Sequence, residues 1–291
     1  MQITLLHNAD RILNYLFGFC LVLLFVLEAN YEDHMRMLIA LGLSLLAAIL
    51  AFLLNWLTLD GMRASVLFGT AVLGTGGWMP ALAVVLFFFS SSLLSRRRGD
   101  EGDIPEVLIS SRTKFRRDGW QVWANGFWIV LMLIFFFLID KELLLIAAYA
   151  AVAAATSDTW ATEIGCRNPG KTVLITSFKK TTPGTDGGIS IKGSLAGIAG
   201  AVFIAVALYF FSPRINEVYA AIIAISGFSG CIVDSILGAK YQHTEMNGIK
   251  EEDSLEPLSS EYKNCIINWA ATGTGAIAAM ILTQIMMYEM V

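Results

Sequence analysis

Charged residues are scarce in this chain. Asp, Glu, Lys and Arg together make up 15% of its 291 residues, whereas 56% are hydrophobic. So few charges cannot cover the surface of a soluble domain of this length, which excludes that class of protein. The composition predicts a polytopic membrane protein.

The side chains needed for several common chemistries are missing or unsuitably spaced. The four cysteines lie far apart without a Cys-x-x-Cys pair, and the three histidines show no metal-ligand spacing. No Gly-x-Ser-x-Gly or P-loop string occurs. The residues after the first apolar stretch, 28–30, do not resemble a cleavage site, so we expect a retained first helix rather than a signal peptide.

Long apolar runs dominate the chain instead, and a run of about 20 residues can cross about 30 Å of hydrocarbon as a helix. Residues 62–94 are divided by Gly74–Gly77 and Pro80, which predicts two helices, 62–75 and 78–94. We expect an all-α bundle of about nine transmembrane helices in one integral membrane domain, residues 1–291. The other seven runs are 11–27, 38–57, 121–139, 143–160, 194–211, 217–237 and 266–288.

Basic residues are concentrated in three of the connecting loops. The opposite connections hold one basic residue each, so the positive-inside rule places the basic loops in the cytoplasm. We therefore expect a cytoplasmic N-terminus, an external C-terminus, a location in the cell (inner) membrane and a site that faces the cytoplasm. The three basic loops are 95–119, 163–193 and 239–265.

Two acidic side chains, Asp158 and Glu163, follow an apolar run in the stretch Ser157–Gly165. Intramembrane carboxylates are costly unless they face a wet cavity, a cation or a partner. On a continuing helix these two point about 140° apart. Either the helix ends between them or only one is a metal ligand, and we favour Asp158; a helix cap or a salt bridge is the alternative. A second intramembrane aspartate, Asp234, lies between Gly230 and Gly238 on one helical face.

The loop that follows combines lysines with glycines. Its Pro-Gly and Gly-Gly pairs allow positive φ angles and let backbone N–H groups converge on an anion, while the lysines add positive charge. We expect this loop to bind the phosphates of a nucleotide, and a solvated hairpin is the alternative. The expected contacts are Lys179, Lys180, Gly184, Thr185, Gly187, Gly188 and Lys192.

Two pairs of side-chain amides recur with a spacing of four residues, which places each pair on one helical face. Gln121 and Asn125 follow a pair of arginines, and Asn264 and Asn268 begin the last span. A polar clasp between helices is the alternative for the first pair, and capping by Asn264 for the second. The residues expected to receive a lipid phosphate are Arg116, Arg117, Gln121, Asn125, Asn264 and Asn268.

Four ordered strings resemble one known family. The stretches Gln121–Gly126, Ser157–Gly165, Pro183–Ser190 and Val233–Ala239 are similar to the integral membrane family called domain of unknown function ninety-two, whose plant members include phytyl-phosphate kinases. A more distant likeness links the chain to CDP-diacylglycerol synthases and dolichol kinases. This likeness implies Mg²⁺ ligands at Asp158 and Asp234 and nucleotide contacts at Lys179, Lys180 and Thr181.

We therefore expect a Mg²⁺-dependent kinase that converts a prenyl monophosphate to the diphosphate with CTP or ATP. Asp158, Glu163 and Lys180 are its expected catalytic residues. The acceptor phosphate is already ionised, so phosphoryl transfer needs no strong base. A cytidylyltransferase that makes a CDP-lipid and a lipid-phosphate transporter or flippase are the alternatives. Expected partners are the two substrates and membrane lipid, without nucleic acid, and the pairing of two copies is left open.

Overall fold

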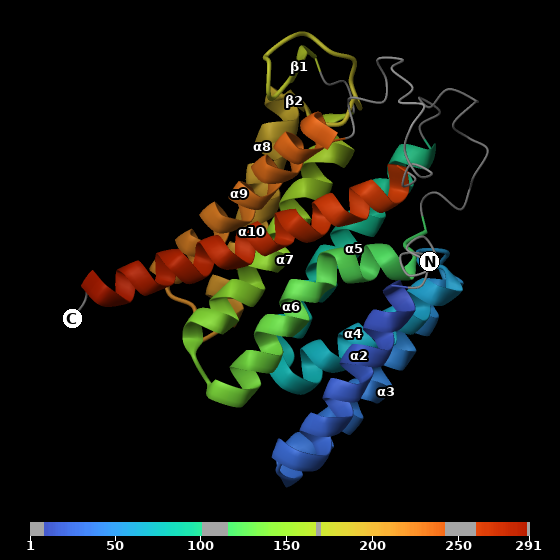
Figure 1. The fold of residues 1–291 in the computed structure, drawn as a ribbon, viewed down its shortest axis with the longest axis vertical. Coiled ribbons are helices and arrows are strands. Elements are labelled where there is room, and N and C mark those ends of the chain that lie inside the picture. Colours follow the sequence, from blue (N-terminus) through green and yellow to red (C-terminus); the bar gives the residue numbers. More distant parts are fainter. Residues whose placement is uncertain (1–8, 101–115, 167–169, 242–259, 290–291) are drawn as a thin grey trace, which may run out of the picture.

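The computed structural model describes residues 9–100, 116–166, 170–241 and 260–289 (Figure 1). Within these ranges the chain forms nine α-helices, one π-helical segment and a small two-stranded sheet, which confirms the expected all-α bundle. The first four helical segments are α2 (Ala9–Leu23), η1 (Leu24–Glu28), α3 (Tyr31–Leu53) and α4 (Leu59–Gly76). The other helices are α5 (Trp78–Asp100), α6 (Gly119–Ile139), α7 (Glu142–Gly165), α8 (Ile191–Phe211), α9 (Glu217–Tyr241) and α10 (Ser260–Glu289).

Eight helical segments in the described part of the chain are long and apolar enough to cross a membrane. The helix outside this group is α4, which carries Asp60 and Arg63 near its start. The expected division of residues 62–94 is confirmed, because α4 ends at Gly76 and α5 begins at Trp78. Gly77 between them has a φ of 80°, a left-handed conformation that glycine adopts without a steric cost.

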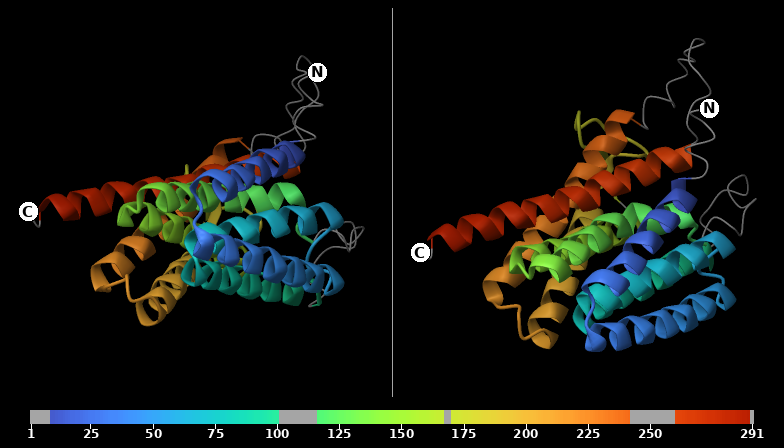
Figure 2. Two further views of the ribbon diagram at one scale, coloured as in Figure 1. Left: turned by 90° about the horizontal axis from the view of Figure 1, so that it is seen from below. Right: turned by 60° about the horizontal axis from the view of Figure 1, so that its bottom comes forward.

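Successive helices run in alternating directions, so the starts of some meet the ends of others (Figure 2). At one end of the bundle, Ser95 of α5 bonds to Glu163 of α7, and Gly165 of α7 packs on Gly193 of α8. Trp120 of α6 stacks edge-on against Tyr262 of α10 at this same end. We call it the site end, because all the sequence motifs singled out above are brought to it.

Helix α7 forms the centre of the bundle and is buried along most of its length. Alanine is the strongest helix former and the smallest side chain with a Cβ, so the run from Ala147 to Ala155 favours both a helix and close neighbours. The buried hydroxyl groups of Thr156 and Ser157 in this helix donate hydrogen bonds to backbone carbonyls of the bundle, as a membrane interior requires. Thr156 donates to Val152 O at 2.8 Å, and Ser157 donates to Gly197 O of α8 at 2.8 Å.

Glycines on three neighbouring helices allow their backbones to approach α7. A Cβ at Gly200 of α8 would lie 3.0 Å from Thr156 O, and one at Gly275 of α10 would lie 3.0 Å from Ala150 O. A Cβ at Gly230 of α9 would lie 2.7 Å from the Cβ of Ala154 of α7 and 2.6 Å from Ala271 O of α10. Larger residues at these three glycines would push the helices apart.

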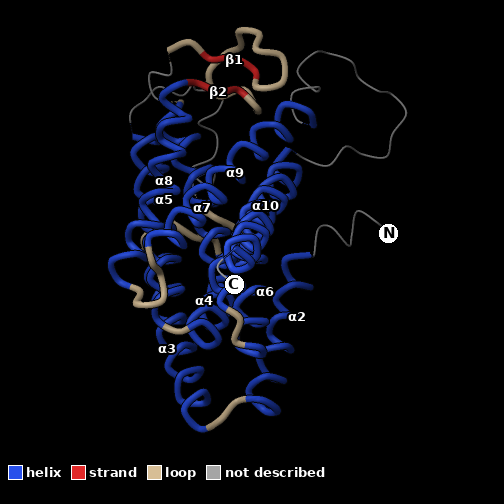
Figure 3. Tube along the Cα trace, turned by 90° about the vertical axis from the view of Figure 1, so that its left-hand side faces the viewer, coloured by secondary structure: helices blue, strands red, loops and turns tan. Residues whose placement is uncertain are grey.

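A hairpin projects beyond the site end between α7 and α8 (Figure 3). Strand β1 (Thr172–Leu174) pairs antiparallel with β2 (Gly188–Ser190), with Val173 opposite Ile189. The lysine-bearing segment folds back on β1, since Thr181 N donates to Thr172 O and Leu174 N donates to Lys179 O. Ser190 then caps α8 by accepting from Gly193 N at 3.1 Å. The loop is thus an ordered hairpin attached directly to a membrane helix.

The orientation of the bundle in the membrane stays a prediction from the basic loops. Their residues at 101–115, 167–169 and 242–259 lie outside the described part of the chain. The helix directions place the start of α2 at the site end, because Asp10 contacts Gly119 there, and the end of α10 at the opposite end. The N-terminal helix therefore begins on the same side as the candidate site, whichever side that is.

Cysteine labelling in intact cells tests the orientation. Ser177 is exposed on the hairpin, and Glu217 is exposed at the opposite end of the bundle. In a background without the native cysteines, we expect an impermeant maleimide to label Glu217→Cys and to label Ser177→Cys only after the membrane is opened. Labelling of Ser177→Cys in intact cells would place the site outside and contradict the predicted topology.

Candidate functional site

A cavity of about 730 Å³ lies at the site end. Its walls come from α5, α6, α7, α8, α9 and α10, and the hairpin loop forms its roof. The motifs that lie far apart in the sequence therefore meet in one place. The predicted site residues that line the cavity are Arg117, Gln121, Asn125, Asp158, Glu163, Gly184, Thr185, Gly187, Gly188, Asp234, Asn264 and Asn268.

Two carboxyl groups face each other in this cavity. Asp158 of α7 and Asp234 of α9 are close enough to hydrogen-bond to each other. Oδ2 of Asp234 is buried and has no hydrogen-bond partner among the described residues. Since α7 continues to Gly165, Asp158 does not cap its helix. Two close acids with an unused oxygen are an arrangement that favours binding of a cation.

Glu163 points to a different wall of the cavity from Asp158, because α7 continues to Gly165 and successive residues of a helix are separated by 100°. Ser95 of α5 donates to Glu163 Oε1 at 2.7 Å. The charge of Glu163 also acts on Arg117, whose guanidinium lies 5.2 Å from the ring centroids of both Phe87 and Phe88. Burial lowers the pKa of Arg117 to about 10, and Glu163 partly offsets that shift. Arg117 therefore remains a cation at neutral pH in the cavity wall.

The side-chain amides form a polar wall from α6 and α10. Asp118 caps α6 by accepting from Gln121 N at 2.8 Å, and Asn125 Nδ2 donates to Gln121 O at 3.0 Å. Because α10 already begins at Ser260, Asn264 lies within the helix and the capping alternative for it is wrong. Asn264 and Asn268 instead face the cavity from α10.

The roof of the cavity is the loop 183–188, in which Gly184 and Gly187 have φ angles of 83° and 75°. Gly187 is pressed against Ala239 at the end of α9. The N–H groups of Thr185 and Gly188 donate to Thr182 O and Thr185 O, which removes them from the expected phosphate cradle. Thr181 and Thr182 hydroxyls both bond to the Thr185 hydroxyl, so side chains as well as backbone fix this turn.

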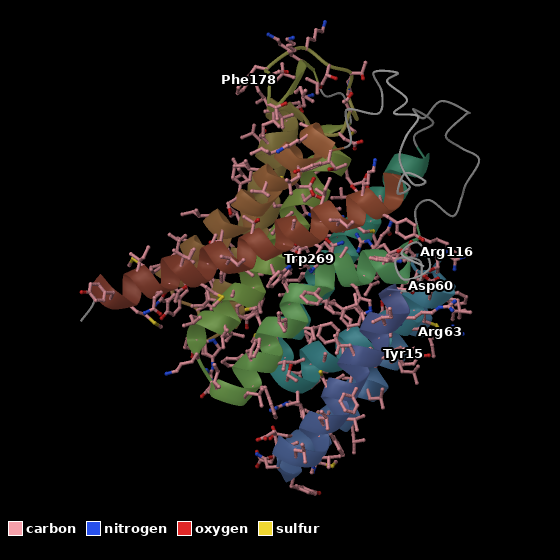
Figure 4. The ribbon with its side chains drawn as sticks, viewed as in Figure 1. Tyr15, Asp60, Arg63, Arg116, Phe178 and Trp269 are labelled. Atoms are coloured by element: carbon pink, nitrogen blue, oxygen red, sulfur yellow. The ribbon has the colours of Figure 1, made fainter. Side chains whose placement is uncertain are left out.

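Five predicted site residues do not line the cavity. Arg116 donates to Leu57 O at 2.9 Å and lies over Phe52, and Figure 4 shows it at the edge of the bundle near Asp60. The hairpin lysines are exposed, and Phe178 beside them marks the hairpin's outer end in the same view. The five residues are Arg116, Lys179, Lys180, Thr181 and Lys192.

Several cavity residues were not singled out from the sequence as site residues. Ser95 ends the hydroxyl-rich segment 90–95, whose sequence is compatible with either a polar wall of the cavity or a contact between helices, and Ser95 does line the cavity. Ser194 of α8 and Phe228 and Ile232 of α9 carry no motif that distinguishes them from other membrane-helix residues. Only the packing of the helices reveals their position.

The acids in the cavity are compatible with Mg²⁺ although they do not form a complete cage. No group of three or more His, Cys, Asp or Glu residues with metal-binding geometry occurs within residues 9–100, 116–166, 170–241 and 260–289. Mg²⁺ typically uses one or two carboxylates and completes its shell with water and substrate phosphates. Asp158 and Asp234, with the orphaned Oδ2 of Asp234, meet that requirement.

The fold and the cavity define a polytopic membrane protein with an acid- and arginine-lined site at one end of its bundle. The chain belongs to the integral membrane protein family DUF92, whose sequence profile matches residues 42–276. This match confirms the resemblance that the four ordered strings indicate.

Relatives occur in archaea, plants and cyanobacteria. An uncharacterised membrane protein of Methanocaldococcus jannaschii is 36% identical over 44% of this chain and 47% of its own length. The chloroplastic protein VTE6 of Arabidopsis thaliana is 30% identical over 46% of this chain and 37% of its own length. An uncharacterised membrane protein of Synechocystis is 30% identical over 60% of this chain and 68% of its own length. The matched part of this chain thus spans less than half the length of the first two of these relatives. No solved structure matches the chain.

Proposed function

We propose that the protein is a membrane kinase that phosphorylates a prenyl monophosphate with a nucleoside triphosphate. The observation that carries this proposal is the facing pair Asp158 and Asp234 in a cavity that also contains the cation Arg117. Phosphoryl transfer is achieved mainly by positioning and charge stabilisation, so this combination suffices without a histidine base. Membership of the DUF92 family, together with the resemblance of the four ordered strings to plant phytyl-phosphate kinases, supports the choice of substrate class.

Each wall of the cavity has a role in this proposal. Asp158 and Asp234 would hold Mg²⁺, which neutralises charge on the transferred phosphoryl group when bound. Arg117 and the amides of Gln121 and Asn125 would donate hydrogen bonds to phosphate oxygens. Glu163 would keep Arg117 in place, and the loop 183–188 would cover the reacting groups and exclude water.

Product analysis with labelled nucleotide tests this function directly. Purified protein in detergent or proteoliposomes is supplied with Mg²⁺, a prenyl monophosphate and either CTP or ATP. A kinase releases a nucleoside diphosphate and forms a prenyl diphosphate, whereas a cytidylyltransferase releases pyrophosphate and forms a CDP-lipid. Release of pyrophosphate, or of no nucleotide product with either nucleotide, would contradict the kinase proposal.

The exposed lysines suggest a role in attracting nucleotide rather than in direct contact. Lys179 and Lys180 lie on the outer face of the hairpin, where exposed charges act through solvent and are screened by salt. We expect Lys179→Ala with Lys180→Ala to raise the nucleotide KM a few-fold at low salt. The difference from wild type should vanish at high salt, where the Debye length is short.

The matched control for this double variant is Lys141→Ala, which removes a lysine at the opposite end of the bundle. It should leave the nucleotide KM unchanged at every salt concentration. A change in kcat that persists at high salt in the double variant would instead show that these lysines act in the reaction itself.

A second cavity favours one alternative, a lipid-phosphate transporter. It encloses about 680 Å³ at the opposite end and is lined by Arg36 and Arg214, each paired with an acid at 2.6–2.7 Å. Tyr149 of α7 lines this cavity and Asp158 the first, nine residues or about 14 Å apart along the helix. Movement of a labelled lipid phosphate across proteoliposomes, without any nucleotide product, would favour transport over the kinase.

A further inference from the structure

The wall of the site-end cavity changes character around helix α9. Asp234 and Gly238 belong to its acidic part, whereas Phe228 and Ile232 are apolar. Successive residues of an α-helix are separated by 100°, so the position of each lining residue around α9 can be assigned. Starting at Asp234, the lining residues follow one another over about 160° in the order Gly238, Cys231, Ser235, Phe228 and Ile232.

The two ends of this strip lie in different surroundings. Asp234 faces the interior of the bundle, where it meets Asp158. Ile232 is 39% exposed and lies on the same outward face as Ile225 and Ile236, which are 63% and 40% exposed. In a membrane this outward face contacts lipid. The cavity therefore extends continuously from the pair of acids to the hydrocarbon-facing surface of the protein.

The opening lies on the side of α9 that faces α8. Cys231, in the middle of the strip, is close to Gly197 of α8, and the two helices pack against each other (Figure 1). Ser194 of α8 and Ile189 of β2 also line the cavity. Helices α6 and α10 line the cavity with the amide-bearing residues Gln121, Asn125, Asn264 and Asn268 and with no apolar residue.

We propose that this opening between α8 and α9 is the port through which the hydrocarbon tail of a phosphorylated lipid enters and lies, with its phosphate directed to Asp158 and Asp234. The shape of the cavity fits an amphiphile, because a charged interior continues into an apolar rim that meets the bilayer. The tail reaches the rim from the bilayer, so contact with Phe228 and Ile232 keeps it in apolar surroundings while its charged phosphate enters the polar part of the cavity. The inference rests on the proposed function and adds the residues that select the tail.

Steric substitution at the rim tests the port by kinetics. Ile232→Trp narrows the opening, and partial exposure gives the larger ring space to be accommodated without repacking the core. We expect kcat/KM for a long prenyl monophosphate to fall about tenfold or more, the effect typical of a change in a hydrophobic subsite. The KM for nucleotide should stay unchanged. Ile236→Trp, one turn further along the lipid-facing side and outside the cavity, is the matched control and should leave both parameters unchanged.

A binding measurement tests the port independently of the kinase reaction. The wild-type protein is irradiated with a prenyl monophosphate that carries a diazirine in its tail, and the labelled peptides are identified by mass spectrometry. We expect labelling of α8 and of the segment of α9 around Phe228 and Ile232, and excess unlabelled prenyl monophosphate should prevent it. Labelling that falls on α6 and α10, or that persists with competitor as it would for bulk lipid, overturns the port.

The kinetic and labelling experiments distinguish a wrong kinase assignment from a wrong port. If the wild-type protein forms no prenyl diphosphate yet the competed label lies between α8 and α9, the kinase assignment is wrong and the port stands. If prenyl diphosphate forms and Ile232→Trp behaves like Ile236→Trp with every chain length, the kinase assignment stands and the port is wrong.

Discussion

Asp158→Asn is expected to insert and fold like the wild-type protein and to lose phosphoryl transfer by about three orders of magnitude or more. An amide cannot supply the negative charge that a Mg²⁺ site requires, and several kcal/mol of charge stabilisation correspond to this loss at 1.36 kcal/mol per factor of ten. The nearly isosteric replacement leaves the packing of α7 intact. Turnover in the labelled-nucleotide assay measures the effect.

The thermal stability of Asp158→Asn, in contrast to its turnover, should not decrease. Two facing acids repel each other when both are ionised, and a charge within a membrane is itself costly. Replacing Asp158 removes one charge from the pair, so the midpoint of thermal unfolding should stay the same or rise. An Asp158→Asn protein with a lower unfolding midpoint, or with near-normal turnover, would show that Asp158 is a structural residue.

The control for this pair of measurements is Asp140→Asn. Asp140 follows α6 at the opposite end and lies 3.8 Å from Arg214, an exposed ion pair of small energetic weight. It should change neither turnover nor the unfolding midpoint appreciably. Asp234→Asn, by contrast, should reproduce both effects of Asp158→Asn, because the two acids act on the same group.

The helices could be predicted from the sequence because the thickness of the bilayer fixes their length. Apolar runs of about 20 residues leave few alternatives, and glycine with Pro80 marked the boundary between α4 and α5. The π-helical segment Leu24–Glu28 carries no such signal and was not predicted. Orientation depends on charges in the loops and not on packing, so the structure leaves it as a prediction.

The candidate site was predictable where a residue is costly in its surroundings. Asp158, Asp234 and Asn125 are polar groups in apolar helices, and each does line the cavity. Their cost in lipid is a property of the residue and needs no knowledge of its neighbours. The rotation of 100° per residue also separated Glu163 from Asp158 correctly once the helix was seen to continue.

Positions set by packing between helices were not predictable in the same way. Periodicity shows which residues share a face, but not which helix lies opposite that face, so Phe228 and Ile232 looked like ordinary lipid-facing residues. The positions of the hairpin lysines were not predictable from the sequence for a similar reason. Pairing with β1 turns Lys179 and Lys180 outward, and that pairing depends on strand register and not on the lysines themselves.

Gly187→Ala is expected to remove most of the activity by displacing the roof of the cavity. Alanine at a φ of 75° costs about 1–3 kcal/mol, and its Cβ would overlap Ala239 at the end of α9. The loop 183–188 can relieve that overlap only by moving off α9, which opens the cavity to water and misplaces the groups that approach the acids. We expect kcat to fall by about a hundredfold, the size typical of a misplacement near 1 Å.

Gly184→Ala is the matched control, because Gly184 has a φ of 83° in the same loop but nothing within 4 Å of the added Cβ. The two variants share the backbone strain and differ only in the contact with Ala239. Hydrogen exchange should show faster exchange of Ile175 N–H in Gly187→Ala than in Gly184→Ala, because this group donates to Gly187 O at 3.0 Å. Equal losses of kcat in the two variants would attribute the effect to strain alone and contradict a role for the Gly187–Ala239 contact in holding the roof on α9.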